Sequence, residues 1–336
     1  MNSREQPVLV CVTPVKNEAW ILERFLRCAS LWADHIIVAD QNSDDGSREI
    51  ACRFPKVTLI HNTSPQYDEG TRQALLLDAA RRIPGRRIII ALDADEMLTA
   101  NWSDSSEWGR LQQAAPGTVL TFQWVNVLPD AAHGWMQPED LPLGFVDDES
   151  AHRGEAIHST RVPAPAGAPR LCLKDVKVLH YQFTDWERMK SKQRWYQCWE
   201  RLHHPAKRPV AVYRQYHHMD AIPPERRRLL QPEWTGGYAR AGIDMAEVRR
   251  EEVYQWDRDV ARWLAEHGRD MFRRCDIWDI NWAERCRIFG LTPAGPMADP
   301  RSALDRRIHQ WLAQTQGRSL DRSVRTRQRL LRLLGW

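Results

Sequence analysis

The 336-residue sequence predicts an α/β fold in which a mostly parallel sheet is flanked by helices and followed by a mainly helical C-terminal extension. Two observations lead to this fold class. Over the first hundred residues, short apolar runs alternate with segments that carry apolar residues at helical spacing. Such alternation indicates βαβ units and hence parallel strands. From Trp186 onward, amphipathic helical patterns predominate.

Each apolar run of the first hundred residues is predicted to be a strand. These runs are residues 8–12, 35–40, 57–60 and 88–92. Helices are predicted between them at 19–32, from about 45, and at 70–83. All four strands end at polar clusters, and the carboxyl ends of parallel strands meet at one edge of a sheet. The polar clusters are therefore expected to converge there.

The middle of the chain is predicted to add strands of mixed direction at 118–122, 125–128 and 176–181. Between them, the Pro- and acid-rich segment 129–169 is predicted to be a long functional loop. Residues 205–240 are also predicted to be a loop, and 276–282 either a short strand or a packed loop. Helices are predicted in the C-terminal part at 186–202, 245–267, 301–313 and 320–334.

Three carboxylates come after the apolar run 88–92: Asp93, Asp95 and Glu96. Asp93 and Asp95 are two residues apart and point the same way if the segment is extended. Two like charges that close together need a cation between them, or one of them must hold a proton. Mg²⁺ that also carries substrate phosphates is the natural cation, because it binds one or two carboxylates plus phosphate oxygens. The alternative is a surface turn of solvated acids. For Glu96, two roles remain open: it lies beside the site, or it caps the next element of the chain.

Three motifs together resemble the start of the family 2 glycosyltransferases of the GT-A fold. They are residues 13–18 (TPVKNE), 36–40 (IIVAD) with 43–47 (SDDGS), and 92–96 (LDADE). Their order and spacing both match. The resemblance is strong over about residues 7–100 and weaker to about 200, and it implies a GT-A-like, Rossmann-like catalytic domain.

The resemblance also implies a metal site. The family's DxD motif, which holds the metal and the sugar-nucleotide diphosphate, corresponds to Asp93 and Asp95. A late histidine often completes that site in the family, which makes His180 the expected third ligand. The alternative for His180 is a core histidine that hydrogen-bonds to the backbone. The expected ion is Mn²⁺ or Mg²⁺, and an imidazole ligand favours manganese.

The resemblance implies donor-binding residues as well. In the family, the acid after the second strand contacts the nucleotide base or ribose, a role carried over to Asp40. The family often has two acids there, whereas this chain has one. The first loop lies under the nucleotide, which points to Pro14, Lys16 and Glu18. Arg72 can add donors to phosphate or base, or it is an ordinary exposed helix arginine.

An inverting transferase needs a carboxylate that deprotonates the acceptor hydroxyl. The resemblance places this base between the DxD motif and the end of the catalytic domain. Asp147, Asp148 and Glu155 are candidates there, and the sequence does not choose among them. Related enzymes often have His-Glu where this chain has His158 and Ser159.

Composition excludes several other classes of protein. A net charge of +4 is too small to indicate nucleic-acid binding by the chain as a whole. The seven cysteines are scattered and include no CxxC pair, so neither a disulfide framework nor a zinc site is expected. No stretch approaches the roughly 18 apolar residues of a membrane span. The expected location is cytoplasmic, either free or peripheral on the inner face of the membrane.

The domain prediction assigns 1–183 to a GT-A-like catalytic domain, with 7–100 as the nucleotide-sugar-binding half and 101–183 as the acceptor half. Residues 184–336 form a Trp- and Arg-rich extension. Its last segment, 318–336, is a basic amphipathic helix that either contacts an anionic membrane or a partner, or packs on the body as a solvated helix.

The predicted function is metal-dependent, inverting transfer of a sugar from a nucleoside-diphosphate donor, expected to be a UDP-sugar. The acceptor is a saccharide or lipid-linked saccharide in cell-surface polysaccharide or lipopolysaccharide synthesis. One alternative is a nucleotidyltransferase that makes nucleotide sugars, but this needs a Gly-rich loop after the first strand, and residues 13–18 contain no glycine. The other alternative is a non-catalytic sugar-binding scaffold, against which the intact acids argue.

Overall fold

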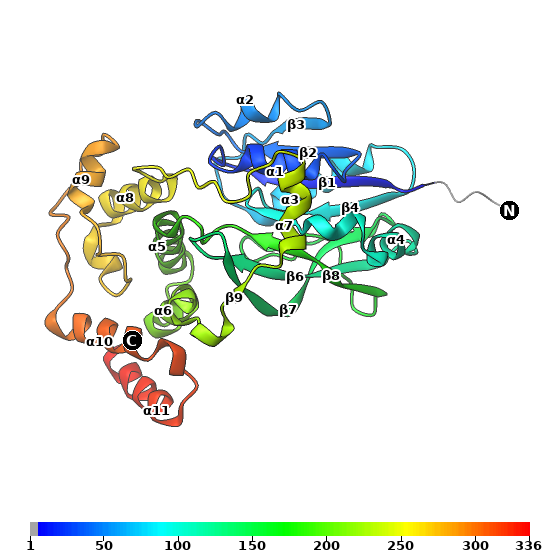
Figure 1. Cartoon of the computed structure of the whole chain (residues 1–336). Coiled ribbons are helices and arrows are strands. Elements are labelled where there is room, and N and C mark those ends of the chain that lie inside the picture. Colours follow the sequence, from blue (N-terminus) through cyan, green and yellow to red (C-terminus); the bar gives the residue numbers. More distant parts are fainter. Residues whose placement is uncertain (1–5) are drawn as a thin grey trace. The chain divides into compact units, whose positions relative to one another are not determined.

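The computed structural model describes residues 6–336 and divides into two compact units (Figure 1). The first contains the chain to Asp185 together with Arg228–Arg249. The second contains Trp186–Arg227 and Arg250–Trp336. No helix within residues 6–336 combines the length and the apolar character needed to cross a membrane.

The first unit is built on one mixed sheet, and the predicted α/β fold is confirmed. Its parallel part has the order β3 (Val57–His61), β2 (His35–Asp40), β1 (Val8–Val15), β4 (Arg87–Ala91). The connecting helices are α1 (Leu22–Ala29), α2 (Ser47–Ala51) and α3 (Glu69–Arg81). All four strands and all three helices occur where the apolar periodicity predicts them.

The second half of the sheet adds strands of both directions beyond β4. They come in the order β7 (His133–Val146), β6 (Val119–Val127), β8 (Arg170–His180), β5 (Glu96–Leu98), while β9 (Arg228–Leu229) pairs with β7. The helix α4 (Ser106–Gln113) precedes β6. The prediction of one long loop over 129–169 is wrong for its first part, because β7 pairs antiparallel with both β4 and β6. Pro142 is tolerated at a register shift between β6 and β7, where the regular hydrogen-bond ladder is interrupted.

The sheet must curl to accommodate β5. This strand lies four places from β4 in the sheet, which is roughly 19 Å in a flat sheet. The connection from Ala91 to Glu96 spans at most roughly 18 Å when fully extended, and it contains a turn in which Glu96 N donates to Asp93 O at 2.9 Å. The last strands therefore curve back toward the carboxyl end of β4. This curvature brings the acids after β4 close to the end of β8.

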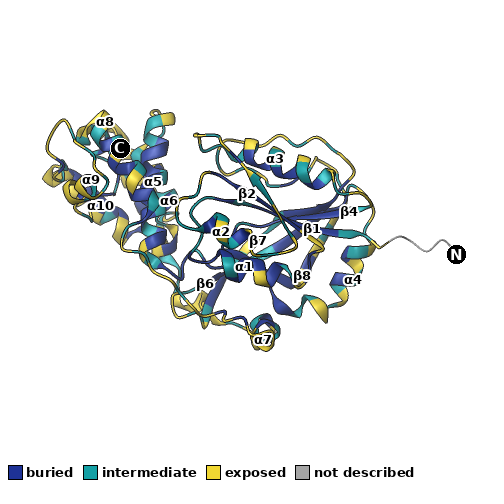
Figure 2. Cartoon of the chain, turned by 90° about the horizontal axis from the view of Figure 1, so that it is seen from above, coloured by how far each residue is buried: buried dark blue, intermediate teal, exposed yellow. Residues whose placement is uncertain are grey.

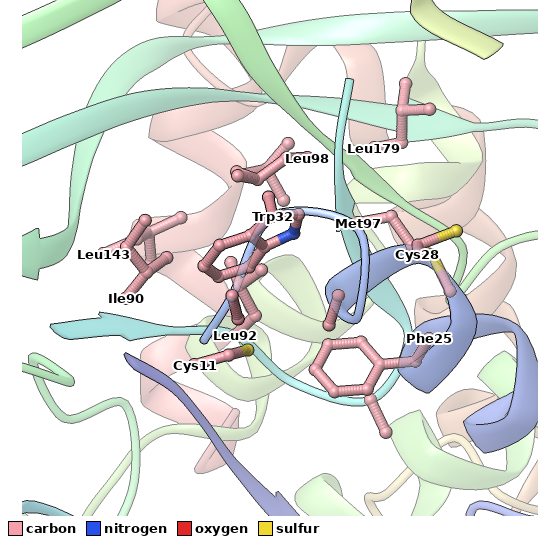
Figure 3. Close-up of a cluster of buried hydrophobic side chains, with 14 of the residues drawn as sticks. Cys11, Phe25, Cys28, Trp32, Ile90, Leu92, Met97, Leu98, Leu143 and Leu179 are labelled. Atoms are coloured by element: carbon pink, nitrogen blue, oxygen red, sulfur yellow. The ribbon is translucent and has the colours of Figure 1, made fainter. Parts of the chain in front are cut away.

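Successive side chains of the strands point into two apolar layers. The strands of the sheet are mostly buried (Figure 2). On one face, Cys11, Ile90 and Leu92 pack with Phe25 of α1 (Figure 3). On the other face, Val10, Val12 and Ile89 pack with Leu76, Leu77 and Ala80 of α3. Apolar residues on both faces are the sequence signature of parallel strands covered on both sides.

The second unit is helical, as predicted for this part of the chain. Its helices are α5 (Trp186–His203), α6 (Pro209–Tyr216), α8 (Gln255–His267), α9 (Trp282–Ile288), α10 (Ala303–Gln314) and α11 (Arg322–Leu331). Two predictions are wrong. The segment 205–240 is not a loop, because it contains α6 and also α7 (Pro232–Arg240), which belongs to the first unit. The helix predicted from 245 begins only at Gln255, since Met245 and the Glu247 carbonyl are engaged in the first unit.

Candidate functional site

The polar ends of the parallel strands meet at one edge of the sheet. Asp40 at the end of β2 is in register with Val15 of β1 and with His61 of β3. Val12 of β1 is in register with Ala91 at the end of β4. With neighbouring strands roughly 4.8 Å apart, Asp40 and the turn after β4 lie about two strand spacings apart. The predicted convergence is confirmed.

Asp40 is a buried carboxylate with an incomplete set of partners. Its side chain is 1% exposed. One oxygen, Oδ2, accepts a hydrogen bond from the Ser43 backbone N–H at 3.3 Å and lies 3.7 Å from Arg48 Nε. Within residues 6–336, nothing donates a hydrogen bond to its Oδ1. Buried polar atoms without a partner are rare and costly, so this oxygen is suited to accept a hydrogen bond from a ligand.

The first loop is fixed to the turn after β2, which joins two of the motifs. The backbone N–H of Asn17 donates to Ser43 Oγ at 2.9 Å, and that of Glu18 donates to Ser47 Oγ at 2.9 Å. The Glu18 carboxylate accepts a hydrogen bond from Trp20 Nε1 at 2.6 Å. Glu18 therefore holds the loop in shape. Pro14 pairs with the strand beside Asp40, and Lys16 lies half-buried directly after β1.

Arg72 lies in the first turn of α3, which comes after the carboxyl end of β3. It is buried, and its guanidinium stacks on the Tyr67 ring at 5.0 Å. Within the described chain, its Nε has no hydrogen-bond partner. The structure thus excludes an ordinary exposed helix arginine and leaves a buried donor at the same edge as Asp40.

Asp93 and Asp95 contact different partners. The argument from spacing needs an extended backbone, whereas residues 93–96 form a turn. Asp93 Oδ2 accepts a hydrogen bond from Arg161 Nη2 at 2.7 Å. Arg161 also donates to both oxygens of Glu96, at 2.9 Å for Oε1. Arg161 thus provides the cation that paired acids require, a role that the sequence prediction gave to a metal alone.

Candidate metal ligands gather around the same turn. Asp95, Glu96 and His180 each offer a ligand atom, and these atoms lie within 4.8 Å of one another. His180 Nε2 is 3.7 Å from Asp95 Oδ2 and 4.0 Å from Glu96 Oε1. Two donors that each lie about 2.1 Å from an ion are at most about 4.2 Å apart, and both of these spacings from His180 meet that limit. All three residues are buried, so the donor set suits one divalent cation, with Glu96 beside Asp95 where Asp93 was predicted.

The strand pairing fixes the orientation of His180. This residue pairs with Glu96 across β8 and β5, and with Asn126 across β8 and β6. Nδ1 of His180 lies 3.0 Å from Asn126 Oδ1 and 3.3 Å from Gln182 Nε2. The shorter contact, to the oxygen, favours a proton on Nδ1, which directs the lone pair of Nε2 toward the acids. Metal-binding histidines are generally oriented by such a partner.

The electrostatics of the cluster result from its burial. Complete burial raises the pKa of Glu96 to about 7; Arg161 opposes this rise, while Asp93 and Asp95 add to it. Burial by itself lowers the pKa of Arg161, but the negative charges of Asp93 and Glu96 outweigh it and hold that pKa above its usual value. The carboxylates are thus only partly neutralised by protein groups, which favours the binding of a further cation.

Two of the three candidate bases lie away from the acids that follow β4. Asp147 is opposite the start of β4, because its backbone N–H donates to the Arg87 carbonyl at 3.0 Å. Its carboxylate is held by Arg81 at 3.1 Å and Arg87 at 2.9 Å. Asp148 is the next residue along the chain. Both therefore lie at the end of β4 opposite to Asp93, separated from it by the length of that strand.

Glu155 lies at the same edge of the sheet as Asp40. Its backbone carbonyl accepts a hydrogen bond from Gly70 N at 3.0 Å, in the first turn of α3. Gly70 and Gly154 pack so closely that a Cβ on Gly70 would lie 2.8 Å from the Gly154 carbonyl oxygen. The Glu155 side chain is exposed. Of the three candidates, it is the one that remains close to the donor-binding residues.

The sequence prediction missed two residues of the site. Arg161 lies in an irregular segment in which no periodicity indicates a direction, so nothing in the sequence pairs it with Asp93. Asn126 could have been found from the sequence, because it is a polar residue inside the apolar run 125–128. The structure shows that it is fully buried, where a polar side chain needs a partner.

Comparison with known proteins adds a family match. The model for glycosyl transferase family 2 matches residues 10–105, which include the first loop, Asp40 and the acids after β4. No curated protein matches the chain.

Solved structures align with parts of the chain at low similarity. Glucosyl-3-phosphoglycerate synthase from Mycobacterium tuberculosis is 16% identical over 35% of this chain and 44% of that one, with a TM-score of 0.27. A 4-diphosphocytidyl-2C-methyl-D-erythritol synthase is 12% identical over 50% and 89%, with a TM-score of 0.32. The inositol-1-phosphate CTP transferase from T. maritima is 9% identical over 53% and 90%, with a TM-score of 0.31.

Proposed function

Because residues 10–105 match glycosyl transferase family 2, we propose that the chain is a metal-dependent, inverting glycosyltransferase. It moves a sugar from a UDP-linked donor to a saccharide or lipid-linked saccharide acceptor in cell-surface polysaccharide or lipopolysaccharide synthesis. One observation carries the proposal. A buried carboxylate with an unpartnered oxygen, Asp40, shares a sheet edge with a buried acid and histidine cluster that fits a divalent ion.

Donor binding is divided between the two ends of this edge. Asp40 accepts a hydrogen bond from the base or ribose of the nucleotide. Arg72 donates from the start of α3, after β3, and Lys16 donates from the first loop, after β1 on the other side of Asp40. Arg161 is already held by Asp93 and Glu96, so its charge is positioned for phosphate oxygens without further loss of side-chain freedom.

The metal site is assigned to Asp95, Glu96 and His180, with Asp93 beside it on the diphosphate side. A divalent ion bound there neutralises negative charge that develops on the leaving diphosphate. The imidazole ligand favours Mn²⁺ over Mg²⁺. Asn126 keeps His180 in the orientation and tautomer that the site requires.

The base that deprotonates the acceptor is assigned to Glu155. It is exposed at the donor edge, whereas Asp147 is fixed by two arginines at the opposite edge. A carboxylate that is open to solvent and close to the diphosphate can receive a proton from a bound hydroxyl group.

The C-terminal segment 318–336 is assigned to peripheral contact with an anionic membrane. Leu320, Leu330 and Leu333 are exposed by 83%, 59% and 84%. Exposed arginines lie between Leu320 and Leu333, in α11 and directly after it. A helix that combines exposed leucine with arginine binds anionic lipid surfaces. Vesicles with anionic lipid should bind the wild-type chain more tightly than the double variant Leu330→Gln/Leu333→Gln. Neutral vesicles should bind the wild type and the double variant weakly.

The test of the proposed activity is turnover of a panel of nucleotide sugars with Mn²⁺ or with EDTA. Metal-dependent release of UDP from one donor is expected, and Asp93→Ala should abolish it because Arg161, the group proposed to contact the diphosphate, loses one of the two carboxylates that hold it. Release of pyrophosphate from a nucleoside triphosphate plus a sugar phosphate would instead identify a nucleotidyltransferase. Unchanged turnover in Asp93→Ala would remove this residue from the site.

A further inference from the structure

The second unit contains a basic cavity that the proposed activity does not use. Its volume is about 150 Å³. It lies between α5, α6 and the segment 270–275, and four cations line it: Arg201, Lys207, Arg273 and Arg274. Asp270 is the one acid among its lining residues. The lining therefore carries a clear excess of positive charge.

Two of these cations are neutralised and two are not. Lys207 pairs with Glu200, and Arg273 Nε lies 3.2 Å from Asp305 Oδ2. Arg201 donates only to backbone carbonyls, those of Met271 at 3.3 Å and Pro205 at 3.1 Å.

Arg274 is held in the same way. It donates to the carbonyls of Leu334, at 3.1 Å, and Gly335, and it stacks on the Trp336 ring at 5.8 Å. Within residues 6–336, no carboxylate lies within 4.0 Å of Arg201 or Arg274. Carbonyl oxygens fix the position of these guanidinium groups without cancelling their charge.

The remaining charges repel each other. The pKa of Arg274 is lowered, first by burial and then by the positive charge of Arg273, with Arg201 adding to the effect and Asp305 opposing it. Repulsion between like charges in a partly buried cavity is relieved by a bound anion. Arginine presents a planar fork of donors that matches the geometry of phosphate oxygens.

The rest of the lining is apolar. Val212 and Cys275 are buried, and Pro209 and Met271 lie beside them. The cavity is smaller than the roughly 300–1,000 Å³ of pockets for drug-sized ligands. A small head group with one phosphate and a short carbon portion matches both its size and its two kinds of lining.

We propose that this cavity binds the phosphate group of a small organic phosphate ester, with Arg201 and Arg274 as its principal donors. The ester is either a soluble metabolite or the head group of a lipid. The site is independent of the metal and nucleotide edge, so it persists whether or not the proposed transferase activity is correct.

The experiment is calorimetric titration of the full chain with glycerol 3-phosphate at low ionic strength, with and without EDTA. The wild type should bind equally in both conditions, and Arg201→Gln should weaken binding at least tenfold. Arg287→Gln is the matched control, because Arg287 is an exposed arginine of the same unit whose side chain is 77% exposed; it should bind like the wild type. Thermal unfolding without ligand verifies that each variant is folded.

A second variant keeps the proposal testable if Arg201→Gln does not fold. Arg201→Lys keeps the charge and loses the planar fork, so its affinity should fall between those of the wild type and Arg201→Gln. No binding by the folded wild type, of glycerol 3-phosphate or of vesicles that contain phosphatidic acid, would overturn the proposal. Equal binding by wild type and folded Arg201→Gln would also overturn it.

The two sources of the phosphate are separated with vesicles. If Arg201→Gln weakens binding of phosphatidic acid vesicles by the same factor as binding of glycerol 3-phosphate, the site takes a lipid head group. If only binding of the soluble ester falls, the site takes a soluble ester.

Discussion

Arg161 is the residue whose removal tests the electrostatics of the site most severely. In Arg161→Met the side chain keeps most of its length, but Asp93 and Glu96 lose their shared cation. Removal of one partner from a buried ion pair costs about 3–5 kcal/mol. Glu96 is fully buried, whereas the Arg161 side chain is 17% exposed, so we expect a loss near the lower end, about 3 kcal/mol, at pH 8 without metal.

The pKa of Glu96 determines how the loss of stability in Arg161→Met changes with pH. The pKa of Glu96 is raised from 4.5 to about 7, and Arg161 is a group that lowers it. Without Arg161 that pKa rises further, so Glu96 is protonated and neutral in the folded variant at pH 5.5. A carboxyl group whose folded pKa is raised destabilises the fold as pH increases through that pKa. The loss of stability in Arg161→Met should therefore be smaller at pH 5.5 than at pH 8.

The assay is urea unfolding in EDTA at both pH values. Arg153→Met is the control, because Arg153 is exposed in the same segment and its replacement should change the free energy of unfolding by less than about 0.5 kcal/mol. Saturating Mn²⁺ at pH 8 should stabilise Arg161→Met more than the wild type, since it replaces the missing charge. An equal loss at both pH values, or no loss at pH 8, would refute the reasoning.

Three further predictions concern other groups. Asn126→Ala should weaken Mn²⁺ binding by about 10–100-fold in calorimetry by freeing His180; unchanged affinity would mean that Asn126 does not orient the ligand. Asp40→Asn should weaken UDP binding by about 1.5–3 kcal/mol, the usual contribution of a hydrogen bond to a charged group; equal dissociation constants would exclude that contact. Burial by itself raises the pKa of Asp276, but the hydrogen bond to His217 and the nearby cations outweigh burial and lower the pKa from 3.8 to about 2. Its stabilising effect is then complete above the unfolded pKa of 3.8 and lost as pH falls toward 2, so the difference in Tm between wild type and Asp276→Asn should disappear near pH 2. A difference that persists there would contradict this assignment.

The sequence sufficed for the parts of the fold that depend on local periodicity. The four parallel strands and their helices were predictable because each strand is a short apolar run, which in β1, β2 and β4 is buried on both faces, and each helix carries an apolar stripe. The strand β7 was not predictable, since Pro138 and Pro142 together with its acids are typical of a loop. Its place is determined by pairing with β6, the preceding strand, and with β4, which is distant in the sequence.

The residues of the site also divide into those that the local sequence pattern could place and those that it could not. Asp40, Asp95 and His180 could be placed because each lies at or just beyond the end of an apolar run. The direction of Asp93 could not, because it depends on a turn rather than on an extended strand. Its partner Arg161 is 68 residues away, and no local pattern connects them. The choice among Asp147, Asp148 and Glu155 likewise required knowledge of which end of β4 each one faces.

The central claim is that one sheet edge binds a nucleoside diphosphate together with a divalent ion. The most direct measurement is calorimetric titration of UDP into the wild type and His180→Gln, each with Mn²⁺ and with EDTA. The account predicts that Mn²⁺ tightens UDP binding to the wild type at least tenfold and has little effect on His180→Gln. Wild-type binding that is equally strong in EDTA, or an undiminished effect of Mn²⁺ on His180→Gln, would contradict it.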